Sequence, residues 1–228
     1  MGWFANIIFV EVTIIKKSKS KFKIIDKRSV FIGKDVVVGN NVTIYENNRI
    51  EGKTVIKDGA VILPNCYIVD SEIGENSVIN YSQSDKAVVG KNCTVGPFAR
   101  LRPNAVIGDG AKIGNFVEIK NARIGNGSKV SHLAYVGDAD IGENCNVGCG
   151  AIFVNYDGVN KHRSTVGNGS FIGSNCNIIA PVNIGDGAYV CAGTTVSKDV
   201  NANDFVIGRV RQEVKENRAD KYLKKGEK

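Results

Sequence analysis

A six-residue repeat runs through the chain from Ile32 to Thr195. Each unit opens with an aliphatic residue, often continues with Gly, and carries a small residue at its fifth position. Examples are IGKDVV (32–37), IGDGAK (107–112) and IGDGAY (184–189). A short, fixed period of this kind is the signature of a solenoid, in which each unit buries its apolar face only by stacking on its neighbours. The repeat therefore predicts an all-β chain of stacked coils.

The positions within the repeat predict how one coil is built. Six residues make a short strand and a turn, and three such units close one triangular coil of about 18 residues. The first and fifth residues point inward, and the fifth must be small because it lies at a narrow corner. Gly, Asn and Asp in the turns tolerate a positive φ. We predict a parallel β-helix of about nine coils, left-handed as in the known hexapeptide-repeat class.

The composition agrees with a thin, repetitive core and argues against a metal site. Aromatic residues make up only 7% of the chain, so the core must consist of Ile, Val, Ala and Cys. Four of the six cysteines fall at the fifth position of a unit, which predicts reduced core residues; they are Cys66, Cys93, Cys145 and Cys176. There is no CxxC spacing, and the two histidines cannot supply a three-histidine site. We expect no metal.

The charge lies mainly at the two ends of the chain. The net charge is +7, with +6 in residues 16–28 and +4 in residues 209–228. No nucleic-acid module accompanies it, so we expect no nucleic-acid partner. No apolar run reaches the roughly 18 residues of a membrane span, and no signal peptide is recognisable, so we expect a cytoplasmic protein. The predicted organisation is a strand and basic linker (1–30), a β-helix (31–200) and a tail or short helix (201–228).

Two interruptions of the repeat are candidate sites, because insertions in a repeat array form loops. The longer one is FVNYDGVNKHRST (153–165), a polar, cationic segment with a turn signal at NYDG (155–158). The second is the polar break INYSQSDKAV (79–88).

Three ionisable side chains depart from the repeat pattern and indicate a functional site. Arg102 and Lys120 are one coil apart and should lie about 4.8 Å from each other along the axis. A bound anion between them is the economical explanation of two stacked cations; solvated surface charge is the alternative. His132, at an outward third position, is suited to taking a proton from an amine or hydroxyl near neutral pH. An ordinary surface histidine is the alternative.

Six stretches combine these residues in a specific order: VGPFARLRP (95–103), GNFVEIKNARIG (114–125), SHLAYVGDADIGENCNVGCG (131–150), NYDGVNK (155–161), IGSNCNIIAPV (172–182) and CAGTTVSKDV (191–200). Together they closely resemble the acetyltransferase half of the bifunctional bacterial GlmU family, whose members make UDP-N-acetylglucosamine. The match runs over most of residues 25–215. The repeat is shared by many hexapeptide proteins, but this series of motifs is not.

The resemblance implies a homotrimer with active sites in the subunit clefts and acetyl transfer from acetyl-CoA to the 2-amino group of glucosamine-1-phosphate. It implies that His132 is the general base and that Glu118 assists by orienting a neighbour. The positions matching sugar-phosphate ligands are Arg102, Lys120, Tyr135, Asn146, Asn155, Tyr156 and Lys161. Those matching acetyl-CoA ligands are Ser174, Ala192 and Arg209.

The chain also departs from the family. No Gly-rich nucleotide loop precedes Asp26, so we expect no uridyltransferase activity, and a separate uridyltransferase is a possible partner. Cys149 and Cys191 stand where the family usually has Ala or another small residue. Two other functions stay open: acyl transfer to a different amine, and a non-catalytic β-helix scaffold.

Overall fold

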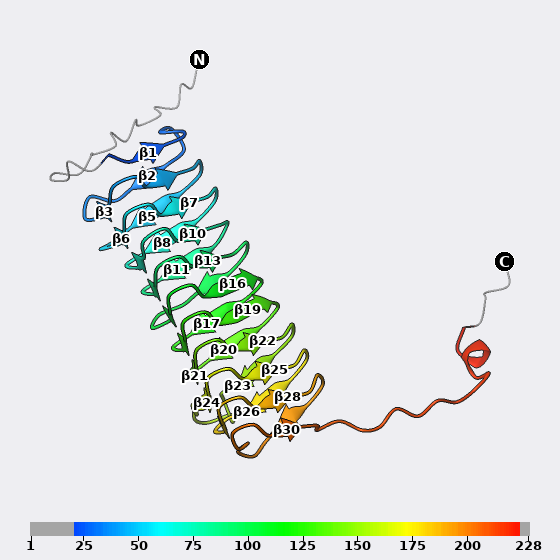
Figure 1. Cartoon of the computed structure of the whole chain (residues 1–228). Coiled ribbons are helices and arrows are strands. Elements are labelled where there is room, and N and C mark those ends of the chain that lie inside the picture. The colour runs from blue at the N-terminus through cyan, green and yellow to red at the C-terminus, as the bar shows by residue number, and fades with distance from the viewer. Residues whose placement is uncertain (1–20, 224–228) are drawn as a thin grey trace, which may run out of the picture.

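The computed structural model describes residues 21–223 as a stack of flat coils with three parallel sheets along its sides (Figure 1). Successive strands along the chain go to successive sheets, so that each strand pairs with the strand one coil away. The sheets contain eleven, ten and nine strands and are here called sheets A, B and C. The fold is the predicted left-handed parallel β-helix, with about ten coils instead of nine.

The strands are mostly two or three residues long because a turn follows in every unit. Sheet A consists of β1 (Lys23–Ile24), β4 (Thr43–Ile44), β7 (Val61–Ile62), β10 (Val78–Ile79), β13 (Thr94–Val95), β16 (Lys112–Asn115), β19 (Lys129–His132), β22 (Asn146–Val147), β25 (Phe171–Ile172), β28 (Tyr189–Val190) and β30 (Phe205–Val206). Sheet B consists of β2 (Phe31–Ile32), β5 (Arg49–Glu51), β8 (Tyr67–Val69), β11 (Gln83–Asp85), β14 (Arg100–Leu101), β17 (Glu118–Lys120), β20 (Tyr135–Gly137), β23 (Ile152–Val154), β26 (Asn177–Ile179) and β29 (Thr195–Val196). Sheet C consists of β3 (Val37–Val38), β6 (Val55–Ile56), β9 (Glu72–Ile73), β12 (Val88–Val89), β15 (Val106–Ile107), β18 (Arg123–Ile124), β21 (Ala139–Ile141), β24 (Ser164–Val166) and β27 (Asn183–Ile184).

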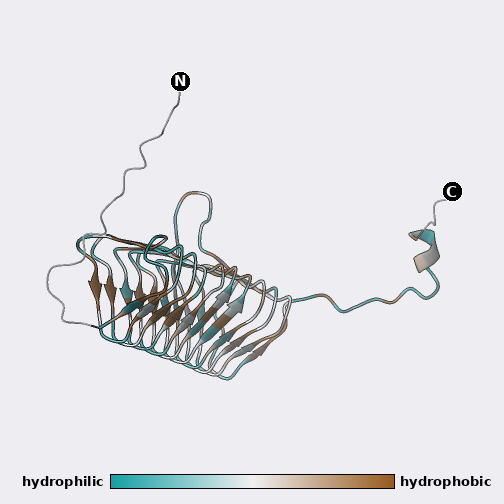
Figure 2. Ribbon diagram, turned by 90° about the horizontal axis from the view of Figure 1, so that it is seen from above, coloured by the Kyte–Doolittle hydropathy of each residue, from teal (hydrophilic) through white to brown (hydrophobic). Residues whose placement is uncertain are grey.

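The interior follows the predicted positions. First-position residues such as Ile44, Ile50 and Ile62 are fully buried, and Figure 2 shows the hydrophobic strands alternating with hydrophilic turns. The four cysteines predicted for the core are buried and free, and burial raises the pKa of the Cys66 thiol to about 11. A thiol with a raised pKa is a weak nucleophile at neutral pH, which agrees with a packing role.

A polar residue at a core position is accepted where its hydrogen bonds are complete. Asn48 takes a fifth position and is 1% exposed. Its amide donates to the carbonyl of Tyr45 at 2.9 Å, and its Oδ1 accepts the N–H of Cys66 at 2.8 Å. Because both halves of the amide are satisfied, its burial carries little penalty.

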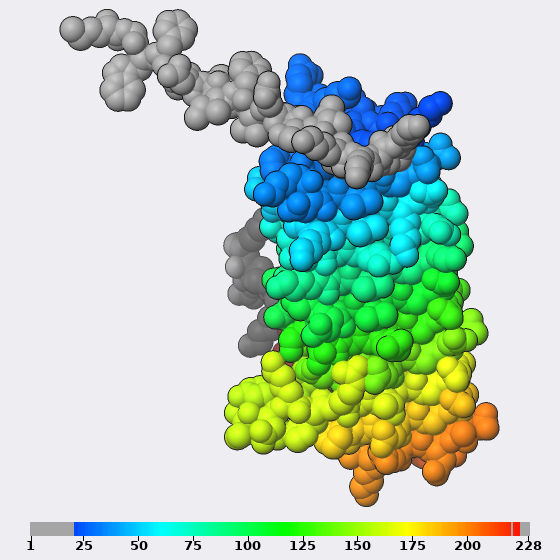
Figure 3. Space-filling model, turned by 90° about the vertical axis from the view of Figure 1, so that its left-hand side faces the viewer, coloured from blue at the N-terminus to red at the C-terminus, as the bar shows by residue number. Residues whose placement is uncertain are grey.

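The two interruptions of the repeat have different outcomes. Residues 79–88 do not form a projecting loop: β11 pairs with β8 and β14, and the inward position is filled by Ser84, whose hydroxyl donates to that of Ser71 at 2.9 Å. The longer interruption does leave the coil, between β23 and β24. It falls in the yellow-green part of the chain that bulges from the surface in Figure 3.

The ends of the described chain show where the coils begin and stop. β1 pairs with β4, and β30 pairs with β28, so regular pairing is present on both sides of residues 31–200. The chain then runs away from the last coil and ends in a 3-10 helix (Ala219–Lys221) (Figure 1). Residues 1–20, expected as part of a strand and basic linker, lie outside the described residues. Within residues 21–223, no helix is long and apolar enough to cross a membrane.

Candidate active site

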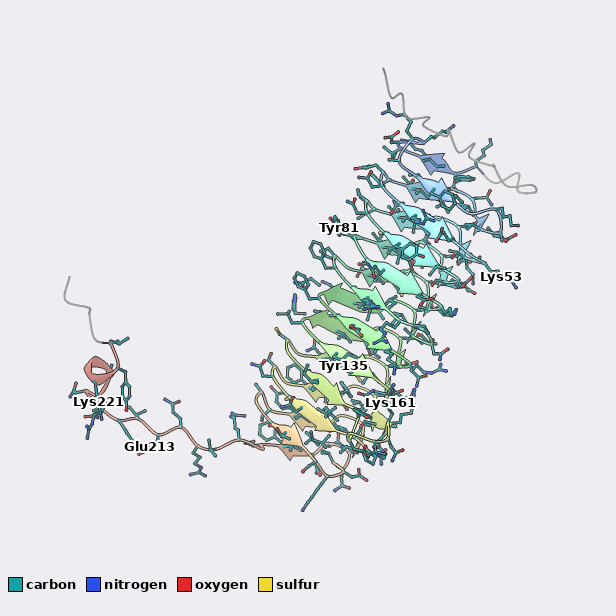
Figure 4. All side chains as sticks on the ribbon, turned by 180° about the vertical axis from the view of Figure 1, so that it is seen from behind. Lys53, Tyr81, Tyr135, Lys161, Glu213 and Lys221 are labelled. Atoms are coloured by element: carbon teal, nitrogen blue, oxygen red, sulfur yellow. The ribbon has the colours of Figure 1, made fainter. Side chains whose placement is uncertain are left out.

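Three cations converge on the outer face of sheet B. The pairing of Leu101 with Ile119 places Arg102 beside Lys120, as the 18-residue spacing predicts. Lys161, from the inserted loop, reaches the Lys120 ammonium group. Tyr135 and Lys161 are both labelled in the C-terminal half of the stack in Figure 4.

Two carboxylates hold this cluster together: Glu118, which the resemblance implies as an orienting residue, and Asp138, which the sequence argument did not foresee. Arg102 Nη1 donates to Glu118 Oε1 at 2.8 Å, and Lys120 Nζ lies 3.6 Å from Asp138 Oδ2. The two stacked cations are therefore stabilised by side chains of the protein itself. An external anion is not needed to explain the stack, but three cations against two carboxylates leave a positive site that can accept one.

Asp138 is the organising residue of the cluster. It is 6% exposed and accepts hydrogen bonds from the side-chain amides of Asn121 and Asn155. Burial raises the pKa of this carboxyl, but the two amides together with Lys120 and Lys161 outweigh it and lower the pKa below its usual value. Asp138 is therefore an ionised, fixed acceptor at neutral pH.

The two lysines affect each other's protonation in opposite directions. The contact with Lys161, together with the charge of Asp138, raises the pKa of Lys120 against the opposing effect of burial. The same contact with Lys120 lowers the pKa of Lys161. Lys161 is thus the member of the pair that loses its proton more easily, and an anion bound between them would favour both charges.

Tyr135 borders the cluster because Gly137, two residues further along β20, has no side chain and leaves room for the tyrosine ring. A Cβ added at Gly137 would lie 2.3 Å from the Tyr135 hydroxyl oxygen. Asn155 Nδ2 donates to that hydroxyl at 3.5 Å, which connects Tyr135 to the same amide that holds Asp138.

His132 lies around the corner, at the end of β19 on sheet A. Its Nδ1 is 2.7 Å from Oδ1 of Asn115, the residue paired with it one coil earlier. Because an amide oxygen only accepts, Nδ1 is the donor in this contact, and the neutral tautomer that fits it has its lone pair on Nε2. This pairing requires Gly114, where an added Cβ would lie 1.9 Å from the Ser131 carbonyl oxygen.

The predicted acetyl-CoA residues form one column below His132. Backbone hydrogen bonds relate successive coils at this corner: Gly150 N–H to the His132 carbonyl, Asn175 to Cys149, and Gly193 to Ser174. The column therefore reads His132, Cys149, Ser174, Ala192. It spans about 14 Å at roughly 4.8 Å per coil. The side chains below the imidazole are small, and at the far end of the column Arg209 donates to the Ala192 carbonyl at 2.9 Å.

The inserted loop, residues 155–163, folds on itself before it returns to the coil. Tyr156 and Lys161 form an antiparallel bridge. Asp157 accepts the N–H groups of Asn160 and Val159 at 2.6 and 2.7 Å and faces His162 Nε2 at 2.7 Å. The bond from Asn160, then that from His162, lowers the pKa of Asp157 to about 2.

Arg163 fastens the end of this loop to sheet C. Its Nε and Nη2 donate to the two carboxylate oxygens of Asp140 at 2.6 Å each, and its Nη1 donates to the Asn121 carbonyl at 3.0 Å. A bidentate guanidinium–carboxylate pair fixes both position and orientation. Lys161, two residues earlier, is thereby held over Lys120.

The site residues predicted from sequence fall into three groups. Arg102, Lys120, Tyr135, Asn155 and Lys161 meet on sheet B, and His132, Ser174, Ala192 and Arg209 follow the corner. Asn146 and Tyr156 are the third group and join neither. Asn146 lies on β22 of sheet A between Lys129 and Phe171, and the exposed Tyr156 donates to the Gly158 carbonyl within its own loop.

Sequence reasoning missed Asp138, Asn115 and Arg163. Asp138 had a signal, because it lies in the five-residue step from Val136 to Ile141, where a repeat-breaking acid needs a reason. Arg163 was noted only as a loop charge. Among residues 21–223, no group of three His, Cys, Asp or Glu side chains is arranged to hold a metal ion.

Family models for hexapeptide repeats match the chain in three places. The bacterial transferase hexapeptide model (six repeats) matches residues 86–121 and 163–198, and the hexapeptide repeat of succinyl-transferase matches residues 24–46.

Among solved structures, the UDP-N-acetylglucosamine acyltransferase of Campylobacter jejuni has a TM-score of 0.54 at 19% identity. The match covers 75% of this chain and 71% of that protein's chain. LpxA of Bacteroides fragilis has a TM-score of 0.52 at 21% identity, with 77% and 68% covered. These two likenesses support the fold alone.

The sequence relatives are more similar. The bifunctional protein GlmU of Caldicellulosiruptor saccharolyticus is 51% identical over 208 residues, which are 91% of this chain and 45% of that protein. GlmU of Clostridium acetobutylicum is 48% identical over 87% of this chain and 43% of its own length. The chain thus spans less than half the length of these relatives. It is a hexapeptide-repeat β-helix, and over about nine-tenths of its length it resembles the C-terminal part of the bifunctional GlmU proteins.

Proposed function

We propose that the chain transfers the acetyl group of acetyl-CoA to the 2-amino group of glucosamine-1-phosphate, in the synthesis of UDP-N-acetylglucosamine. The observation that carries the proposal is the cation cluster of Arg102, Lys120 and Lys161 one corner away from His132, in a chain about half identical to GlmU proteins. A sugar phosphate has the two features this arrangement suits: an anion for the cluster and an amine for the imidazole.

Each group of residues has its own role in the proposed reaction, according to its chemistry. The cluster binds the phosphate, and the bonds of Glu118 and Asp138 keep its cations oriented before the substrate arrives. His132 Nε2 accepts the ammonium proton, so that the free amine can attack the thioester carbonyl. The new bond joins the sugar nitrogen to the acetyl carbon and the carbon–sulfur bond breaks. The nitrogen gives up a second proton, and CoA takes up a proton and leaves as the thiol. Holding both reactants in one geometry supplies the orientation contribution.

Acetyl-CoA fits the corner column in shape and polarity. The small residues Cys149, Ser174 and Ala192 leave space for an extended arm that ends at His132, and Arg209 provides a cation at the far end. This column therefore suits a long co-substrate with a phosphorylated end, in agreement with an acyl-CoA.

We also propose that the protein is a homotrimer assembled at this corner. A ladder of Tyr81, Phe98, Phe116 and Leu133 lines it, with side chains 45–56% exposed; the labelled Tyr81 stands at the edge of the stack in Figure 4. The rings of Tyr81 and Phe98 are 4.8 Å apart, and those of Phe98 and Phe116 5.2 Å apart. All four residues have a positive φ, a conformation that costs a bulky side chain roughly 1–2 kcal/mol. Burial against other copies of the chain offsets this cost.

The proposed activity is tested by acetyl-CoA-dependent thiol release with glucosamine-1-phosphate. We expect release by the wild type and a loss of about 10²–10⁴ in rate for His132→Ala. Arg28→Gln, far from the site, is the control. Glucosamine and other amines are offered in parallel, because transfer to one of them in preference identifies a different acceptor. Absence of release from a folded trimer, or full activity of His132→Ala, contradicts the proposal.

The trimer is tested by sedimentation. We expect three copies for the wild type and dissociation for Phe98→Ser combined with Phe116→Ser. Phe205→Ser, at an exposed aromatic residue of sheet A outside this ladder, should leave the assembly intact. If the wild type sediments as a monomer, the proposed homotrimer is wrong.

A further inference from the structure

A groove of about 360 Å³ lies on sheet B, on the N-terminal side of the cation cluster and continuous with it. Its walls are two columns of outward side chains on β11 and β14. Gln83 and Arg100 form one wall, and Asp85 and Arg102 form the other. Tyr67 lies at the far end, and Arg102 belongs to both the groove and the candidate active site. The volume lies within the range of small-molecule sites.

Three polar side chains of this groove have no partner in the described part of the protein, whereas Tyr67 donates to Glu51 and Arg102 donates to Glu118. Within residues 21–223, the side chains of Gln83, Asp85 and Arg100 make no hydrogen bond or ion pair with the protein. On the same sheet, Arg49 pairs with Glu51, and Arg102 pairs with Glu118. Three free polar side chains around one hollow are therefore available to a ligand.

The order of these groups along the sheet defines the chemistry of that ligand. From the N-terminal side it reads aromatic ring, amide with carboxylate, two guanidinium groups, and then Lys120. A ring stacks on a nucleobase, an acidic side chain accepts the hydroxyls of a ribose, and guanidinium groups bind phosphate. One coil per group is a spacing of roughly 5 Å, comparable with the steps from base to ribose to phosphates in an extended nucleotide.

We propose that this groove binds the nucleoside part of a nucleoside-diphosphate amino sugar. The base lies on Tyr67, the ribose between Gln83 and Asp85, and the first phosphate between Arg100 and Arg102. The second phosphate then takes the place of the sugar phosphate at Arg102 and Lys120. Because the two ligands share Arg102, the nucleotide sugar competes with the sugar phosphate. The proposal deepens the proposed function, on which its account of the second phosphate rests.

The test compares two ligands that differ only in the nucleotide part. Calorimetry on the full chain measures Kd for UDP-N-acetylglucosamine and for N-acetylglucosamine-1-phosphate. We expect the nucleotide sugar to bind at least tenfold more tightly. Arg100→Gln should weaken its binding at least tenfold while changing that of the sugar phosphate less than twofold. Tyr67→Leu and Asp85→Asn should act in the same selective way, by about fivefold. Arg28→Gln, an exposed arginine at the N-terminal end of the stack and outside the groove, is the matched control.

The results of these measurements either support or overturn the groove proposal. Equal binding of the two ligands by the wild type, or equal weakening of both by Arg100→Gln, overturns the proposal. Thiol release measured on the same samples separates it from the proposed function. Release without preference for the nucleotide means that the groove proposal alone fails. Selective nucleotide binding without release means that the groove exists but the proposed acetyl transfer does not.

Discussion

Asp70 and Asp138 occupy equivalent corners of the stack, and their different surroundings show how the fold creates a site. Both follow a strand of sheet B in a five-residue step, with φ values of 46° and 47°. Asp70 is exposed and accepts one backbone bond, from Lys53 at 2.9 Å. Asp138 is buried and holds Lys120, Asn121 and Asn155. The local backbone is the same, so the difference comes from the neighbouring coils: Asp138 meets Lys120 and Asn121 of the coil before it and Asn155 of the inserted loop after it.

The comparison extends to the regions around the two residues. In the coils near Asp70 the charged side chains form exposed pairs, such as Lys57 with Glu72. Near Asp138 the charges are partly withdrawn from water and concentrated, which strengthens their interactions. A regular coil thus provides stability through its interior, whereas an interrupted coil can carry chemistry on its surface.

The largest expected effect is in the regular interior. Ile50→Ala removes a fully buried first-position side chain that stacks on Ile32 and Ile68, and should lower the free energy of unfolding by about 2–5 kcal/mol. Denaturant unfolding measures it. A loss below about 1 kcal/mol would show that neighbouring coils close the cavity.

The second prediction contrasts the two aspartates directly. Asp138→Ala leaves the buried amide of Asn155, the half-buried amide of Asn121 and Lys120 without their acceptor. It should cost about 2–3 kcal/mol of stability, with a clear loss of acetyl transfer. Asp70→Ala removes one exposed bond and should cost about 1 kcal/mol or less, with activity unchanged. Similar losses for both variants would mean that the inserted loop does not create the difference.

Asp138 should also shape the acid side of the stability curve. Its folded pKa lies below the ordinary value of about 3.9. Its contribution is therefore fully present above the unfolded pKa and is lost as the pH falls through the folded one. We expect Asp138→Asn to reduce the dependence of unfolding on pH below about 4, relative to the wild type. An unchanged slope would contradict the depressed pKa.

A smaller effect is expected at the anchor of the loop. Arg163→Gln breaks the bidentate bond to Asp140 and should raise KM for glucosamine-1-phosphate about tenfold, since Lys161 loses its fixed position. The unfolding midpoint should change little. Partial recovery of KM in Arg163→Lys would support a positioning role, and a change in kcat alone would argue against it.

The smallest effect belongs to a surface pair of the regular coils. The side chains of Lys57 and Glu72 are 43% and 41% exposed, and ion pairs at the surface add little to stability. Lys57→Gln should leave the unfolding midpoint within about a degree of the wild type, although the contact with Glu72 raises the pKa of Lys57. A large shift would show that surface charge contributes more to these coils than their interior packing suggests.

The sequence by itself determined the stacked coils, the inward positions and the neighbourhood of Arg102 and Lys120. A six-residue period is a local rule repeated many times, and a fixed spacing converts position along the chain into position along the axis. It also identified the interruption at 153–165. The expectation of a loop at 79–88 was wrong, because Ser84 takes the place of an aliphatic residue without breaking the coil.

Only the tertiary structure determined which side chains position the residues of the candidate site. Asn115 lies 17 residues from His132, Asp140 23 residues from Arg163, and Asn155 17 residues from Asp138. Five-residue steps and the inserted loop change the register between coils, so these partners do not follow from a six-residue count. Side-chain contacts depend on that register, on burial and on hydrogen-bond geometry, all of which arise when distant units are stacked.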